Sequence, residues 1–104
     1  MCSSDLTEQA EGSVVWELSH AMFGGLELEG GRFINTNFDT YNLMRFNQAP
    51  HVDVLFASSG GTKWGGLGEP AGPPAPPAVA NAIFYATGKR VRSTPFIRHD
   101  LSWT

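Results

Sequence analysis

A stretch rich in glycine and proline, residues 60–77, constrains the fold of this 104-residue chain more than any other feature. Proline lacks the amide donor that helices and sheets need, and glycine weakens both structures, so a regular element cannot form there. We therefore expect a long loop that depends on contacts with other segments to hold one conformation. A chain of this length forms at most one domain, with a small core.

Regular elements are predicted on the N-terminal side of this loop. Apolar positions recur at helical spacing over residues 8–23, and two glycines follow as a stop signal. Residues 26–35 predict a β-hairpin around a Gly-Gly turn, with Leu28 opposite Phe33. An irregular connection follows, and alternating apolar positions over residues 52–56 predict a further strand.

A second helix is predicted after the loop. It starts near Pro77, a residue that suits a first helical turn, and Gly88 provides the C-cap. Its expected apolar face comprises Val79, Ala82, Ile83 and Ala86. The order helix, β-hairpin, strand, long Gly/Pro loop, helix is that of an α+β fold. Three candidate strands are too few for a well-covered sheet, which indicates that other parts of a larger protein complete it.

Charge and composition exclude several classes of function. The net charge is −3 and the isoelectric point about 5.4, with no basic stripe that could bind a nucleic-acid backbone. No apolar run approaches the roughly 20 residues that span a bilayer. The single cysteine, Cys2, cannot form an internal disulfide.

The first six residues read Met-Cys-Ser-Ser-Asp-Leu, while the translated end of a common sequencing adapter reads Val-Cys-Ser-Ser-Asp-Leu. A GTG start codon would be written as Met. We therefore expect residues 1–6 to be a non-native, adapter-derived leader, which is to be kept out of fold reasoning. Residues 7–104 are then the native part.

The segment GGLGEP, residues 65–70, presents one acidic side chain on a bare loop. Glycines on both sides of a reactive residue let the backbone approach a bulky group without Cβ clashes, and Pro70 fixes the exit direction. A carboxylate held beside a metal centre can take a proton as a general base. Glu69 is therefore the candidate for chemistry, although composition alone would favour a solvent-facing acid in a turn.

Residues 65–84 strongly resemble the signature near the C-terminus of the molybdenum-binding subunits of the xanthine dehydrogenase family. The segment QAEG, residues 9–12, resembles the Gln-x-Glu-Gly segment of that family, and residues 37–45 resemble the strand region after it. Residues 86–92 most resemble the branch of isoquinoline oxidoreductases, nicotinate dehydrogenases and bacterial aldehyde dehydrogenases. The resemblance implies that residues 7–104 are the C-terminal part of a molybdopterin-binding domain.

The resemblance also implies an activity, that of a molybdenum-dependent oxidoreductase which oxidises an aldehyde or N-heterocycle with water-derived oxygen. In that enzyme Glu69 would be the catalytic general base, the amide of Gln9 would contact the pterin, and Gly68 would contribute backbone contact. The implied cofactor is molybdopterin in its cytosine dinucleotide form, and the chain supplies no metal ligand.

The implied partners are a 2Fe-2S subunit, which removes the electrons, and the upstream remainder of the same subunit. The fragment alone is expected to be inactive, because the rest of the pocket lies upstream. The resemblance leaves the substrate open, and it leaves the location open between the periplasm or membrane and the cytoplasm. Glu17 departs from the family, which usually has glycine at this position, and this puts tight helix packing in doubt.

The Gly/Pro loop also permits two interpretations other than part of a molybdenum site. A dinucleotide fingerprint must open a helix directly, and Pro70 with Pro73 prevents this. Residues 73–77 contain two PxxP spacings, the minimal pattern of a polyproline ligand. A small proline-rich interaction module that binds a partner through Pro73 to Pro77 is therefore the alternative function.

Overall fold

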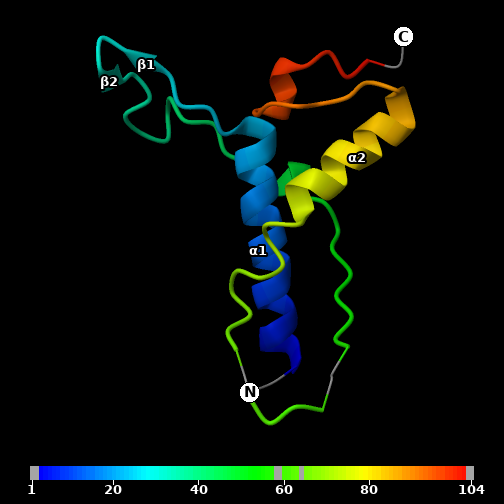
Figure 1. Cartoon of the computed structure of the whole chain (residues 1–104). Helices are drawn as coiled ribbons and strands as arrows, with labels where there is room; N and C mark the ends of the chain where they lie inside the picture. Colours follow the sequence, from blue (N-terminus) through cyan, green and yellow to red (C-terminus); the bar gives the residue numbers. More distant parts are fainter. Residues whose placement is uncertain (1–2, 58–59, 64, 103–104) are drawn as a thin grey trace.

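Helix α1 forms the axis of the structure, and the other segments are arranged along it (Figure 1). The computed structural model describes residues 3–57, 60–63 and 65–102. The elements described are α1 (Ser3–Phe23), β1 (Leu28–Glu29), β2 (Arg32–Phe33), the 3-10 helix η1 (Phe46–Gln48), α2 (Ala75–Thr87) and the 3-10 helix η2 (Phe96–Arg98). The hairpin projects from the C-terminal end of α1, and α2 packs obliquely against the same half of that helix.

Helix α1 confirms the first predicted helix but begins at Ser3 rather than at residue 8. It ends at Phe23, as the following glycines predicted, and the N–H of Gly24 donates to the carbonyl of His20 at 3.0 Å. Of the expected leader, residues 1 and 2 lie outside the described residues, and the remainder forms the first turn of α1.

The predicted hairpin is present with the predicted register. Leu28 pairs with Phe33 across an antiparallel two-stranded sheet. Gly30 and Gly31 have φ values of 55° and 79°, the left-handed conformation that this tight turn requires. Leu28 and Phe33 are 66% and 57% exposed, so the hairpin adds no core to the described chain.

The strand predicted over residues 52–56 is wrong. This segment is extended but belongs to no sheet, because no described strand lies beside it to accept its backbone hydrogen bonds. Its apolar residues are not covered either, since Leu55 is 95% and Phe56 48% exposed. In Figure 1 it runs alongside the N-terminal half of α1 on the side opposite the Gly/Pro loop.

Helix α2 confirms the second predicted helix and begins at Ala75, two residues before Pro77. Gly88 is the C-cap, with a φ of 73° and an N–H that donates to the carbonyl of Phe84 at 2.8 Å. The predicted face is correct only in part, because Val79 and Ile83 pack on the core whereas Ala82 and Ala86 are exposed. The helix is turned so that Ala80, rather than Ala82, completes the contact.

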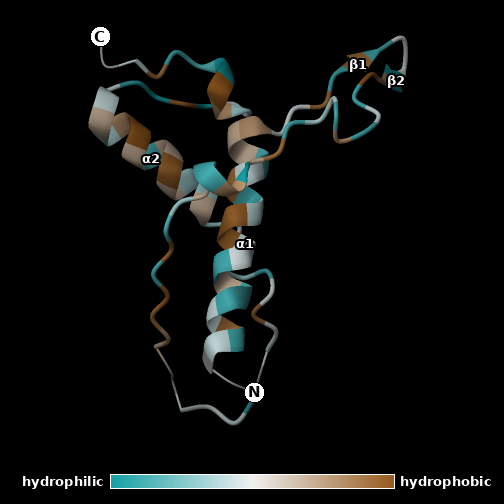
Figure 2. Cartoon of the chain, turned by 180° about the vertical axis from the view of Figure 1, so that it is seen from behind, coloured by the Kyte–Doolittle hydropathy of each residue, from teal (hydrophilic) through white to brown (hydrophobic). Residues whose placement is uncertain are grey.

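A small core joins α1 to α2 and the C-terminal segment. It consists of Ala21, Val91 and Phe96, against which residues of α1, α2 and the C-terminal segment pack. Figure 2 shows apolar residues on α2 and η2 around this junction. Two helices and one small antiparallel sheet agree with the α+β class. No described side chain is fully buried, so the core is small even for this length.

An ion pair fixes the segment after α2. The ammonium of Lys89 lies 3.1 Å from the carboxylate of Asp100. Hydrogen bonds from the side chain and the backbone of Ser102, followed by those of Lys89 and its charge, lower the pKa of Asp100 from 3.8 to about 2. Because the folded state lowers this pKa, the stabilisation is complete above about pH 4 and is lost as the pH falls towards 2.

We therefore expect Asp100→Asn to loosen residues 89–102 at pH 5 and to have a progressively smaller effect as the pH falls to 2. Hydrogen exchange of this segment, compared with the wild type at each pH, measures the difference. Asp39→Asn, which removes an exposed carboxylate from the connection after the hairpin, is the control. An Asp100→Asn effect that is constant over this pH range would contradict the assignment.

Candidate functional site

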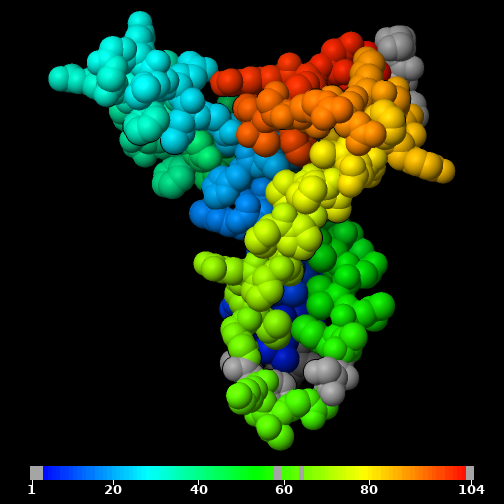
Figure 3. Space-filling view, in the orientation of Figure 1, coloured from blue at the N-terminus to red at the C-terminus, as the bar shows by residue number. Residues whose placement is uncertain are grey.

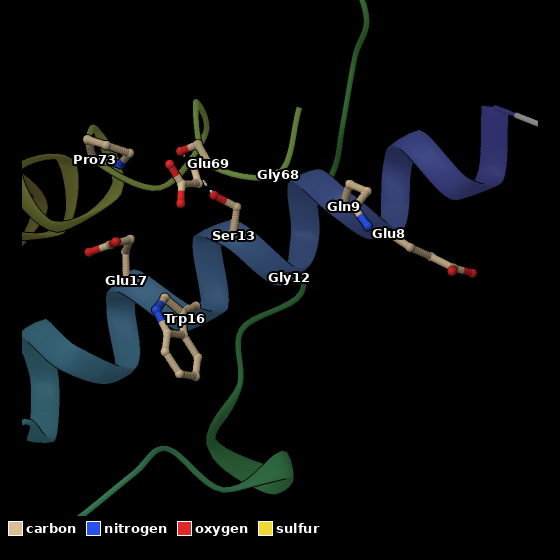
Figure 4. A pocket seen from close by; sticks show the side chains of 9 residues that line it. All are labelled: Glu8, Gln9, Gly12, Ser13, Trp16, Glu17, Gly68, Glu69 and Pro73. Atoms are coloured by element: carbon tan, nitrogen blue, oxygen red, sulfur yellow. Dashed lines mark hydrogen bonds between the residues drawn. The ribbon is translucent and has the colours of Figure 1, made fainter. Parts of the chain in front are cut away.

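A groove of about 550 Å³ lies between the N-terminal half of α1 and the Gly/Pro loop. Figure 4 shows that side chains from successive turns of α1 form one wall, and the loop forms the other. The lining residues are Glu8, Gln9, Gly12, Ser13, Trp16, Glu17, Gly68, Glu69 and Pro73. The Gly/Pro loop therefore obtains from α1 the external contacts that its composition requires.

All three residues predicted for the site line this one groove. Gln9 lies on α1, whereas Gly68 and Glu69 lie on the loop, nearly 60 residues later in the sequence. The side-chain oxygen Oε1 of Gln9 lies 3.3 Å from the position that a Cβ on Gly68 would occupy. The amide group predicted to bind a cofactor and the bare backbone beside the candidate base are thus brought together.

The backbone of Glu69 is held by two hydrogen bonds. Its carbonyl oxygen accepts from the hydroxyl of Ser13 at 3.2 Å and from the N–H of Gly72 at 3.0 Å. The carbonyl of Gly72 then accepts from the N–H of Ala75, the first residue of α2, at 2.9 Å. The turn that carries Glu69 is therefore attached to α1 on one side and to α2 on the other.

Gly72 is buried and lies close against α1. A Cβ at this position would lie 2.5 Å from Cγ of Glu17 and 3.0 Å from Oγ of Ser13. Glu17, the departure from the family pattern, is half-buried and lines the groove, so it does not lie on an exposed helix face. The close contact between Glu17 and the loop is possible because the loop has a glycine, Gly72, at the point of contact.

The sequence analysis missed Ser13 as a site residue. The signal was present, because Gln9, Ser13 and Glu17 are spaced four residues apart and share one face of α1. Trp16 also lines the groove, 59% exposed, with its ring edge against His20 at a centroid distance of 4.7 Å.

The groove is acidic. Glu8, Glu17 and Glu69 supply three carboxylates, and none of the described residues that line it is basic. Among the described residues, no hydrogen bond or ion pair is formed with the carboxylate of Glu69, which is exposed in this chain. Within the same part of the chain, no cluster of three or more His, Cys, Asp and Glu residues could hold a metal ion. The groove therefore contains a carboxylate with no partner among the described residues, beside an amide and a bare backbone.

The proline segment does not have the conformation that a polyproline ligand requires. Pro74, the N-cap of α2, has φ −75° and ψ −16°, and the two prolines after Ala75 lie in the first turn of the helix. A polyproline II segment needs ψ near roughly +145°. The alternative of a proline-rich interaction module therefore has no structural support.

Similarity to known proteins covers most of the chain. It is 39% identical over 87 residues to a membrane-bound aldehyde dehydrogenase [pyrroloquinoline-quinone] of Gluconacetobacter polyoxogenes, a match that covers 84% of the chain and 11% of that protein. It is 31% identical over 87 residues to a subunit of the nicotinate dehydrogenase of Pseudomonas putida, covering 84% of the chain and 7% of that protein. The chain belongs to the same family as these two dehydrogenases.

This match confirms the resemblance to the xanthine dehydrogenase family, in its branch of aldehyde and nicotinate dehydrogenases. No protein-family model matches the chain. The match spans 11% of the length of the aldehyde dehydrogenase and 7% of the length of the nicotinate dehydrogenase subunit. None of its described helices is both long and apolar enough to cross a membrane.

Proposed function

We propose that this chain is part of a molybdenum hydroxylase that oxidises an aldehyde or N-heterocycle with water-derived oxygen, and that Glu69 is its general base. The observation that supports this proposal is the groove in which Gln9, Gly68 and Glu69 meet, although α1 and the loop are far apart in sequence. Further support comes from the names of the two relatives that match 84% of the chain, which describe an aldehyde dehydrogenase and a nicotinate dehydrogenase.

Glu69 would act by accepting a proton. Its carboxylate is unengaged among the described residues, and its main chain is fixed by Ser13 and Gly72. A base held in this way can remove a proton from water-derived oxygen as that oxygen attacks the substrate carbon. When bound, the molybdenum cofactor supplies the acceptor for the two electrons that the substrate loses.

Gln9 and Gly68 would hold the cofactor. The side chain of Gln9 is exposed to the groove and offers both a donor and an acceptor to a pterin ring. Gly68 brings bare backbone against the amide of Gln9, and Gly65 and Gly66 have no neighbour within 4 Å of where a Cβ would lie. These residues fit a flat, polar ring system that approaches the main chain closely.

Pyrroloquinoline quinone, which the name of one relative contains, fits the groove less well. This quinone carries three carboxylates, whereas Glu8, Glu17 and Glu69 already make the groove acidic. Like charges in a shared site repel, and no basic residue of the lining offsets them. For the same reason, we assign the phosphates of a pterin dinucleotide to residues outside this groove.

The surface of the chain supports its placement within a larger subunit. Its accessible area is 8153 Å², about 2,400 Å² more than the roughly 5,700 Å² expected for a folded monomer of 11.3 kDa. Its radius of gyration is 16.6 Å, against about 13 Å for a compact domain of this length. Figure 3 shows the hairpin projecting at the upper left, away from the N-terminal half of α1.

We propose that the remainder of the same subunit covers this excess surface and completes the substrate pocket. Large exposed apolar residues include Leu28 on the hairpin, Phe46 and Leu55 in residues 46–56, and Tyr85 on α2. A surface excess of this size exceeds the roughly 800 Å² that each partner buries in an interface of standard size. The 2Fe-2S subunit that removes the electrons is proposed to bind this assembled subunit, since the name of one relative describes it as one subunit of its enzyme.

Growth of the source cells on tungstate tests the proposal. Tungsten competes with molybdenum for the cofactor, so the purified intact enzyme should lose activity towards acetaldehyde or nicotinate with a dye as electron acceptor. Metal analysis should show molybdenum in the active enzyme and its loss in step with activity. Activity that is unaffected by tungstate, in an enzyme that contains no molybdenum, would refute the assignment.

A further inference from the structure

Ser13 is a buried polar residue in the groove, and its hydroxyl bonds to the turn that carries Glu69. It is 8% exposed and lies on α1 one turn after Gln9 and one turn before Glu17. A serine within a helix commonly donates to the carbonyl of the preceding turn. Ser13 instead donates to the carbonyl of Glu69, 56 residues later in the sequence.

We infer that Ser13 is a positioning residue, which sets the orientation of the Glu69 carboxylate through the backbone of the loop. This inference rests on the proposed role of Glu69. In Figure 4 a dashed line joins Ser13 to Glu69, and the acceptor of this bond is the carbonyl oxygen of Glu69 rather than its carboxylate. Its effect is to fix the peptide plane from which the Glu69 side chain departs.

Three contacts make this bond specific rather than incidental. The same carbonyl accepts from the N–H of Gly72, so the turn is already closed when it meets Ser13. The missing Cβ of Gly72 allows the loop to lie against Oγ of Ser13, because a Cβ there would be 3.0 Å away. Gln9 contacts the loop one turn earlier, at Gly68, so the helix touches both ends of the segment.

The inference is tested with Ser13→Ala and Ser13→Thr in the intact subunit, produced with its partner. Loss of the hydroxyl should lower kcat per bound cofactor about tenfold, since a small displacement of a catalytic group is costly, while KM for acetaldehyde or nicotinate changes less than about twofold. Ser13→Thr keeps the hydroxyl and should retain most of the activity. Hydrogen exchange over residues 66–74 should rise in Ser13→Ala only.

Ser19→Ala is the matched control. Ser19 is the other buried serine described on α1, and its hydroxyl accepts from the N–H of Met44 at 2.9 Å, away from the groove. Its loss should leave kcat and exchange of the loop unchanged. Equal effects of the two alanine variants, or a fall of cofactor content in step with kcat for Ser13→Ala, would overturn the inference in favour of a structural role.

Glu69→Gln measured in parallel separates this inference from the proposed function. An inactive Glu69→Gln enzyme with a fully active Ser13→Ala enzyme would refute the positioning role alone. A fully active Glu69→Gln enzyme would refute the general base itself. If Ser13→Ala yields no soluble subunit, Ser13→Cys, which keeps a weak donor of similar size, provides the same comparison with Ser13→Thr.

Discussion

Glu69→Gln in the intact enzyme is expected to lower kcat by about 10² to 10⁴ while the cofactor remains bound. Glutamine has nearly the same shape but cannot accept the proton, so only the contribution of general-base catalysis is removed. The main-chain bonds of Glu69 to Ser13 and Gly72 do not involve the replaced group and should persist. Steady-state kinetics on acetaldehyde or nicotinate, normalised to molybdenum content, measure the effect.

Glu29→Gln is the control for this substitution. Glu29 is an exposed glutamate on β1, on the hairpin that projects away from the groove, and the variant should keep normal turnover. A fall in KM together with kcat for Glu69→Gln would indicate altered ground-state binding rather than loss of a base. Turnover within about threefold of the wild type would exclude Glu69 as the base.

Gly72→Ala is expected to lower kcat by about a hundredfold through displacement of the Glu69 turn. The added Cβ would lie 2.5 Å from Cγ of Glu17, a separation that real structures do not tolerate, so either the Glu17 side chain must rotate or the loop must move away from α1. The second close approach, 3.0 Å to Oγ of the buried Ser13, favours movement of the loop. Displacement of a catalytic group by about 1 Å can cost that factor. Kinetics and hydrogen exchange of residues 66–74 should both report the displacement.

The double variant Glu17→Ala with Gly72→Ala provides the internal control. Removing Cγ of Glu17 relieves the closest contact, while alanine preserves the helix propensity of α1. Activity should recover in part only, because Oγ of Ser13 and the carbonyl of Glu69 also lie within 3.3 Å of the new Cβ. Strictly additive losses would show that residues 17 and 72 do not contact each other in the enzyme.

The features predicted correctly from sequence are those with local causes. The register of the hairpin follows from its two turn glycines, and the C-terminal end of α2 follows from Gly88. The three predicted site residues were found through their motifs, and the structure brings them to one groove. The assigned chemical roles of Gln9, Gly68 and Glu69 remain predictions that the variants above test.

The features that were missed have non-local causes. Alternation over residues 52–56 was interpreted as a strand, but a strand exists only when another strand pairs with it, and none does in the described chain. The orientation of α2 depends on where Val91 and Phe96 lie, so Ala80 could not be distinguished from Ala82 in advance. The roles of Ser13 and Gly72 depend on the contact between α1 and the loop, which are far apart in the sequence.

The short chain of hydrogen bonds from Glu69 through Gly72 to Ala75 has a mechanical consequence. The first residue of α2 is bonded to the turn that carries Glu69, so a change in the orientation of α2 would displace that turn. Its far end exposes Tyr85 almost completely, and the ring of Phe84 is 39% exposed. Packing of the remainder of the subunit against that end, as proposed above, would therefore also act on the turn that carries Glu69, so that assembly of the enzyme and alignment of the proposed base would be coupled.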